Sequence, residues 1–116
     1  MILLRVFAWL LVLILIIATV VPAAERPVTG IGHGYEHLLS FAFVGAVFAL
    51  AYPWRLIVLL PLAVAFAGLL EIIQIPLPTR HARLTDFVVD ALASCLGIAL
   101  SSRMLAFQRD RSTDKA

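Results

Sequence analysis

Long runs of apolar residues dominate the chain, and their length limits the folds available to it. The first run, residues 6–21, has 16 consecutive uncharged residues, and Ile2, Leu3 and Leu4 extend it. A helix needs about 20 apolar residues to cross a bilayer. The whole chain is 63% hydrophobic and 14% charged, whereas a soluble domain carries about 25% charged residues. The sequence therefore predicts an all-α membrane protein.

The breaks between the apolar runs predict a single domain of 116 residues that forms a bundle of four transmembrane helices. Prolines and glycines mark the first break, and Pro76 and Pro78 mark the third. Pro53 marks the second break, where we expect Trp54 and Arg55 to lie at the membrane interface. The predicted spans cover residues 2–21, 35–52, 54–75 and 85–105, and residues 106–116 form a polar tail that we expect to be disordered.

The first run has a second interpretation. A short basic start, an apolar stretch and the sequence Pro22-Ala23-Ala24 are also typical of a cleaved signal peptide. The length of the run and its leucine and isoleucine content favour a helix that is retained.

The distribution of Lys and Arg predicts the orientation of the four spans. Four spans put both termini on one side, where six Lys and Arg residues lie, against three on the other side. Because these residues favour the cytoplasm, we expect both termini to be cytoplasmic. The net charge of +2 is small and the basic residues are scattered, so nucleic acid is not an expected partner. The oligomeric state stays open.

With this orientation, most of the polar side chains near the helices gather at the outer face. The start of the second span, the end of the third and the start of the fourth meet there. Charged groups lose hydration inside a membrane, so ionisable side chains there indicate function. The candidate ligand-binding residues are His37, Glu71, Gln74, Arg80, Arg83, Asp86 and Asp90. The inner half has almost no polar side chain, which argues against transport.

Several functions suit this cluster. Arg80 and Arg83 could hold an anion through paired hydrogen bonds, with Glu71 and Asp86 positioning them. An acid–base enzyme would use Glu71 or Asp86 as the base and His37 as the acid. A structural ion-pair network is the third interpretation, since such networks also combine these residue types.

Two other types of site have weaker support. No HxxxH or HExxH spacing lies on a definite helix, so we expect no metal and no cofactor. Small residues recur at four-residue spacing, around Gly45 and Gly97 for example, and allow close helix packing in lipid. These small faces serve packing within the chain or, alternatively, contact with an assembly partner.

Three stretches of the chain resemble the VanZ-like family of small membrane proteins. They are Glu36-His37-Leu38-Leu39-Ser40-Phe41, Glu71-Ile72-Ile73-Gln74, and Arg80 followed six residues later by Asp86. Asp90 stands where the family usually has Asn. The resemblance implies a multi-pass protein of the bacterial inner membrane with a role in the cell envelope, since the family's namesake is associated with resistance to the glycopeptide teicoplanin. It implies no reaction.

Together, the polar cluster and the resemblance predict a binding protein. The expected ligand is an anionic component of the envelope, either a lipid-linked phosphate intermediate or a phospholipid head group.

Overall fold

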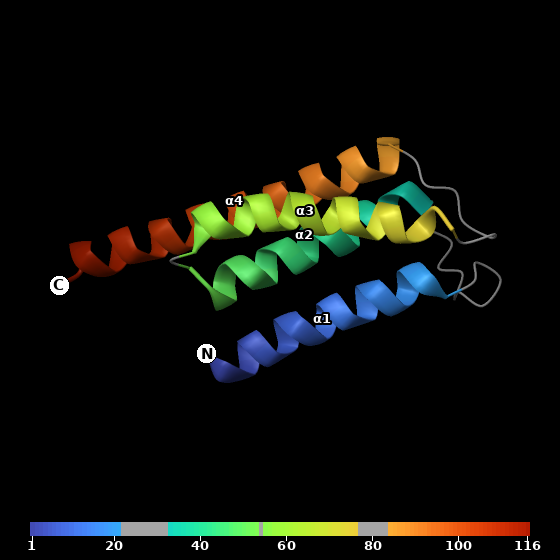
Figure 1. Cartoon of the computed structure of the whole chain (residues 1–116). Helices are drawn as coiled ribbons and strands as arrows, with labels where there is room; N and C mark the ends of the chain where they lie inside the picture. The colour runs from blue at the N-terminus through green and yellow to red at the C-terminus, as the bar shows by residue number, and fades with distance from the viewer. Residues whose placement is uncertain (22–32, 54, 77–83) are drawn as a thin grey trace.

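The computed structural model describes residues 1–21, 33–53, 55–76 and 84–116. They form four helices, α1 (Ile2–Val20), α2 (His33–Ala51), α3 (Leu56–Gln74) and α4 (Leu84–Asp114), and no strand occurs among these residues (Figure 1). The all-helical prediction is confirmed, and the helix ends of α1 to α3 lie within two residues of the expected ones.

Three of the four helices have the length and apolar character to cross a membrane, namely α1, α3 and α4. The apolar part of α2 is shorter and covers Tyr35–Ala51. At about 1.5 Å per residue it is about 26 Å long, slightly less than the roughly 30 Å of a hydrocarbon core. The structure therefore supports a membrane protein.

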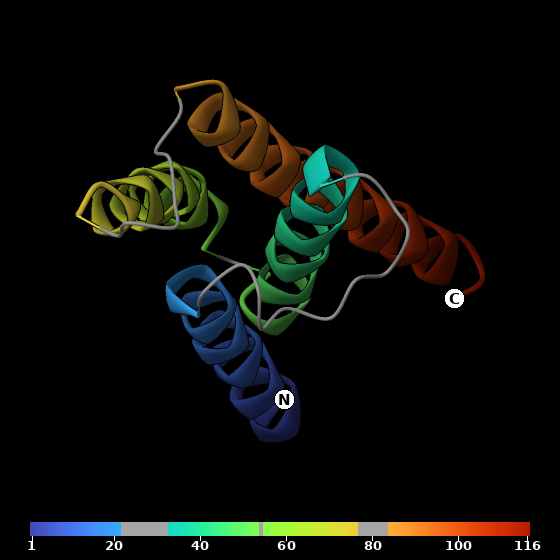
Figure 2. The same cartoon turned by 90° about the vertical axis from the view of Figure 1, so that its right-hand side faces the viewer.

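Successive helices run in opposite directions, so both chain termini lie at the same end of the molecule (Figure 1). This end, here called the terminal end, contains Met1, the turn between α2 and α3, and the last part of α4. The opposite end, here called the polar end, contains Val20, His33, Gln74 and Leu84. Viewed end-on, α2 lies between α1 and α4, and the described residues of α1 contact α2 and α3 without reaching α4 (Figure 2).

Glycines bring α2 and α4 unusually close together. A Cβ atom added to Gly97 would collide with the backbone carbonyl oxygen of Ala42, and one added to Gly45 would collide with that of Ser94. Backbone atoms cannot move aside as a side-chain end can, so only glycine fits at either position. The small residues recognised in the sequence are thus used between two helices of the same chain.

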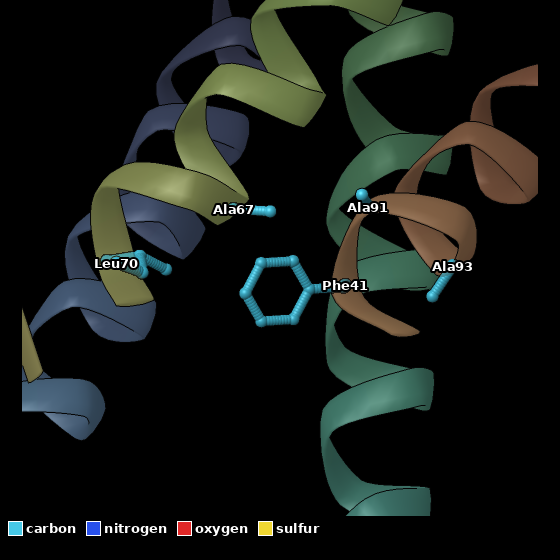
Figure 3. Packing of buried hydrophobic residues seen from close by; sticks show 5 residues of the cluster. All are labelled: Phe41, Ala67, Leu70, Ala91 and Ala93. Carbon is cyan, nitrogen blue, oxygen red and sulfur yellow. The ribbon is translucent and has the colours of Figure 1, made fainter. Parts of the chain in front are cut away.

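The core beside this contact lies among α2, α3 and α4. Phe41 projects from α2 toward Ala67 and Leu70 on α3, and Ala91 of α4 packs against the same group (Figure 3). All four residues are buried. This core determines which faces of α3 and α4 point inward. Glu71 follows Leu70 and Asp90 precedes Ala91, and both polar residues are buried as well.

At the terminal end, Arg5 of α1 contacts the C-terminal end of α2. Its Nε donates a hydrogen bond of 3.5 Å to the carbonyl oxygen of Ala51, where α2 ends, and its guanidinium lies 5.0 Å from the ring centre of Tyr52. Trp9 Nε1 donates a hydrogen bond of 3.2 Å to the Tyr52 hydroxyl. The structure thus gives Arg5 a structural role in addition to its charge at this end of the molecule.

The prediction of a disordered tail over residues 106–116 is wrong. α4 continues to Asp114 and is 31 residues long, about 46 Å at the usual rise per residue. The extension has no Gly or Pro after Gly97 and is rich in strong helix formers. The guanidinium of Arg111 also lies 5.1 Å from the ring centre of Phe107, one turn earlier.

Candidate functional site

Polar side chains from α2, α3 and α4 meet at the polar end. We call His37, Glu71, Gln74 and Asp90 the polar layer. Asp90 is 2% exposed, Gln74 is 6% exposed and Glu71 is 8% exposed. Groups of this kind are rarely buried so deeply in a small protein unless they have partners or a function.

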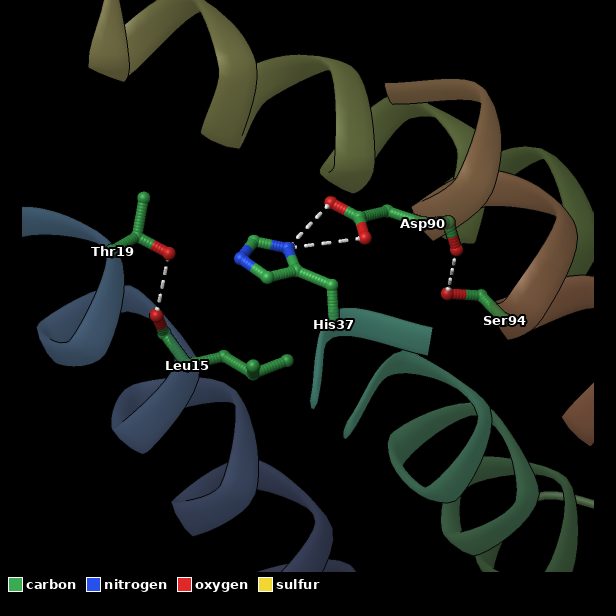
Figure 4. Close-up of polar contacts among 5 residues, drawn as sticks. All are labelled: Leu15, Thr19, His37, Asp90 and Ser94. Carbon is green, nitrogen blue, oxygen red and sulfur yellow. Dashed lines mark hydrogen bonds and ion pairs between the residues drawn. The ribbon is translucent and has the colours of Figure 1, made fainter. Parts of the chain in front are cut away.

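The centre of the polar layer is a contact between His37 and Asp90. Nδ1 of His37 lies 3.3 Å from one carboxylate oxygen of Asp90 and 3.4 Å from the other (Figure 4). The ring of His37 is stacked on that of Phe41, with 6.2 Å between centres and 15° between planes. With Nδ1 protonated, His37 donates to the carboxylate, and the pair compensates a buried group that would otherwise be costly.

The close approach of α2 and α4 is what brings this pair together. Ser94, whose backbone adjoins Gly45, also donates a hydrogen bond of 2.9 Å from its Oγ to the carbonyl oxygen of Asp90 (Figure 4). His37 lies two turns before Gly45 on α2, and Asp90 lies one turn before Ser94 on α4. The small-residue contact therefore sets the spacing at which imidazole and carboxylate face each other.

Glu71 and Gln74 enter the layer from α3. They share the buried face of that helix with Ala67 and Leu70, because positions spaced by three and four residues lie on one side of a helix. Both also lie at the C-terminal end of α3, where the helix dipole is negative and disfavours a carboxylate. The described part of the layer is thus rich in hydrogen-bond acceptors.

The structure changes the roles expected of the two aspartates. The sequence predicts a role for Asp86, either in positioning the arginines or as a base, and none for Asp90 beyond ligand binding, whereas His37 contacts Asp90. Asp86 lies half-buried in the first turn of α4, and no hydrogen bond or ion pair of its side chain occurs among the described residues. The predicted site residues Arg80 and Arg83 lie outside the described residues.

Sequence reasoning missed Thr19 on α1. This residue is 5% exposed, and its Oγ1 donates a hydrogen bond of 2.8 Å to the carbonyl oxygen of Leu15. In Figure 4, the His37 ring lies between Asp90 and these two residues of α1. A signal was present, since Thr19 is the only hydroxyl group in the first apolar run.

The metal-binding potential of the site is low in the part of the chain that the structure describes. No group of three or more His, Cys, Asp or Glu side chains there could hold a metal ion. The His37–Asp90 pair offers only two such groups, fewer than the three protein ligands of a typical catalytic zinc site.

Comparisons with protein families, with curated proteins and with solved structures found no match to this chain.

Proposed function

We propose that all four helices span the membrane, with both termini in the cytoplasm and the polar layer on the outer side. The antiparallel order of the helices supports this arrangement, because it puts both termini at one end. Among the described residues, this terminal end carries more Lys and Arg than the polar end, which favours the cytoplasm for it. These residues are Arg5, Arg55, Arg103, Arg109, Arg111 and Lys115.

In this orientation, the protein binds an anionic lipid head group or a lipid-linked phosphate at its polar end. The observation that carries the proposal is the buried His37–Asp90 pair within a layer of ionisable and amide side chains. Apolar residues of similar size would stabilise helix packing as well as a buried charged pair does. Polar groups kept at membrane depth are therefore best explained by a ligand.

Binding of the phosphate group requires a cationic side chain, and the four residues of the polar layer include no Lys or Arg. Glu71 and Asp90 are carboxylates and would repel a phosphate. Arg80 and Arg83 lie in sequence between Gln74, which ends α3, and Leu84, which begins α4, and both of these helix ends are at the polar end. In the proposal they hold the phosphate through paired, charge-assisted hydrogen bonds, while the polar layer contacts the rest of the head group.

The resemblance to VanZ-like proteins extends this proposal to the bacterial inner membrane and to glycopeptide susceptibility. It rests on the three quoted stretches, and the binding proposal does not depend on it.

Binding of short-chain lipids to the full-length protein in detergent, measured by native mass spectrometry, tests the proposal. We expect phosphatidic acid to bind more tightly than phosphatidylcholine, and Arg80→Gln and Arg83→Gln each to weaken that binding about tenfold or more. Arg109→Gln, in the exposed extension of α4, is the matched control. Equal binding of the two lipids, or an equal loss in the control, would refute the proposal.

The His37–Asp90 pair also favours a second candidate, an acid–base enzyme. A carboxylate that orients an imidazole through Nδ1 is a recurring catalytic arrangement. In this version His37 acts on substrate and Asp90 is the positioning residue, instead of Glu71 or Asp86 acting as the base. Incubation with farnesyl diphosphate and measurement of released phosphate checks it: hydrolysis that Asp90→Asn reduces supports the enzyme, and absence of hydrolysis by the wild type counts against it.

A further inference from the structure

Gln74 has a buried side chain that ends in a carboxamide. The residue is 6% exposed, and within the part of the chain that the structure describes no hydrogen bond uses its carboxamide. A carboxamide has two N–H donors and an acceptor oxygen. Burying it without satisfying these groups is costly, and such a group in a protein interior calls for an explanation.

The position of Gln74 connects it with the polar layer. It follows Leu70 by four residues and Glu71 by three, so it lies on the face of α3 that packs toward α2 and α4. That face meets the core around Phe41, one turn from His37 on α2. The amide therefore lies on the same helix face as Glu71, at the end of the molecule where His37 and Asp90 pair and which is assigned to the ligand.

The chemistry of these groups favours a hydroxyl as their partner. A phosphate oxygen can accept from the amide N–H but is repelled by the carboxylate of Asp90. An ammonium group can donate to the carboxylates but cannot accept from the amide. A hydroxyl does both, because it accepts from the amide N–H while donating its proton to a carboxylate.

We propose that Gln74 binds a hydroxyl group of the ligand, so that the site selects a phosphodiester lipid with a hydroxyl-bearing head group over a bare phosphate. The inference rests on the proposed function, in which Arg80 and Arg83 hold the phosphate. Glycerol and sugar-like head groups share this chemistry.

The test compares four short-chain lipids on the full-length protein by native mass spectrometry. The lipids are phosphatidylglycerol, phosphatidylinositol, phosphatidic acid and phosphatidylcholine. We expect phosphatidylglycerol or phosphatidylinositol to bind about fivefold more tightly than phosphatidic acid, the size of one hydrogen bond, and the tighter of the two identifies the kind of head group. Gln74→Met, which removes the amide and keeps the side-chain length, should abolish this preference. The matched control is Gln108→Met on the exposed extension of α4.

Thermal unfolding of the ligand-free protein is the second measurement. If the amide lacks a partner, Gln74→Met leaves the melting temperature unchanged or raises it, since an unsatisfied buried group is removed. A melting temperature several degrees lower would overturn the inference, because the amide would then be a structural group that is satisfied without ligand.

The lipid series also separates the two proposals. If phosphatidic acid, phosphatidylglycerol and phosphatidylinositol bind equally, and all bind more tightly than phosphatidylcholine, the hydroxyl inference fails and the anion site stands. If none of them binds more tightly than phosphatidylcholine, the proposed function fails.

Discussion

Replacing His37 by Phe tests how much the pair with Asp90 stabilises the protein. Phe keeps a flat ring that can stack on Phe41, as His37 does at 6.2 Å, so packing changes little. The substitution removes the described partner of a carboxylate whose side chain is 3% exposed. Asp90 would then have to stay buried without the imidazole or move toward the aqueous edge of the molecule.

The size of the effect follows from the geometry. Removing one member of a buried charged pair costs about 3–5 kcal/mol. The His37 side chain is 18% exposed and its contacts with Asp90 are 3.3 and 3.4 Å, longer than the usual charge-assisted bond, so we expect about 3 kcal/mol, at the lower end. Asp90→Asn keeps an acceptor oxygen and should cost about 1 kcal/mol.

A double-mutant cycle isolates the interaction. When Asn replaces Asp90, His37→Phe removes only a neutral hydrogen bond, so it should cost about 1 kcal/mol and the coupling energy should be about 2 kcal/mol. Reversible unfolding in mixed detergent micelles, followed by helical circular dichroism, gives the four free energies of unfolding.

The control is Ser102→Ala. It removes a hydroxyl that bonds only to the Ile98 carbonyl within the described structure and should cost less than about 0.5 kcal/mol. A coupling energy below about 0.5 kcal/mol would show that the pair contributes no net stability and would refute the reasoning.

Two further predictions concern helix packing and are measured by the same unfolding experiment. Gly97→Ala should destabilise by about 1–3 kcal/mol, because the new methyl group meets the backbone of Ala42; a stability equal to the wild type would show that α2 and α4 are not in close contact. Gly68→Ala is its control, since the new Cβ would lie 3.3 Å from a side-chain atom that can move, and it should be neutral or slightly stabilising. Arg5→Gln should destabilise by about 1 kcal/mol, because Arg5 bonds to the carbonyl oxygen of Ala51; no loss would mean that this bond does not stabilise the packing of α1.

The helices could be predicted from the sequence because the signal is strong and local. Long apolar runs bounded by Pro22, Pro53 and Pro76 leave few alternatives to membrane-length helices. Helices α1, α2 and α3 each end two residues before one of these prolines. The tail over residues 106–116 was predicted wrongly because polar composition was weighed above helix propensity. Ala106, Gln108, Arg109 and Arg111 all favour helix, and an existing helix is cheap to extend.

The candidate site was predictable in location but not in its pairing. Spacing put Glu71 with Gln74 and Asp86 with Asp90 on common helix faces, yet it could not show which aspartate faces His37. That depends on the relative position of α2 and α4, which the contact at Gly45 sets across a large separation in sequence. The burial of Gln74 without a hydrogen-bond partner among the described residues is likewise a property of the packed molecule and cannot be read from a motif.

The central claim is that the ligand binds at the His37–Asp90 pair. Nuclear magnetic resonance of the protein with ¹⁵N-labelled histidine tests it directly, because the chain has three histidines and His37→Phe identifies the signals of His37. Titration with short-chain phosphatidylglycerol should shift these ring signals saturably, and phosphatidylcholine should not. Saturable binding of phosphatidylglycerol with unchanged His37 signals would place the ligand elsewhere and contradict the account.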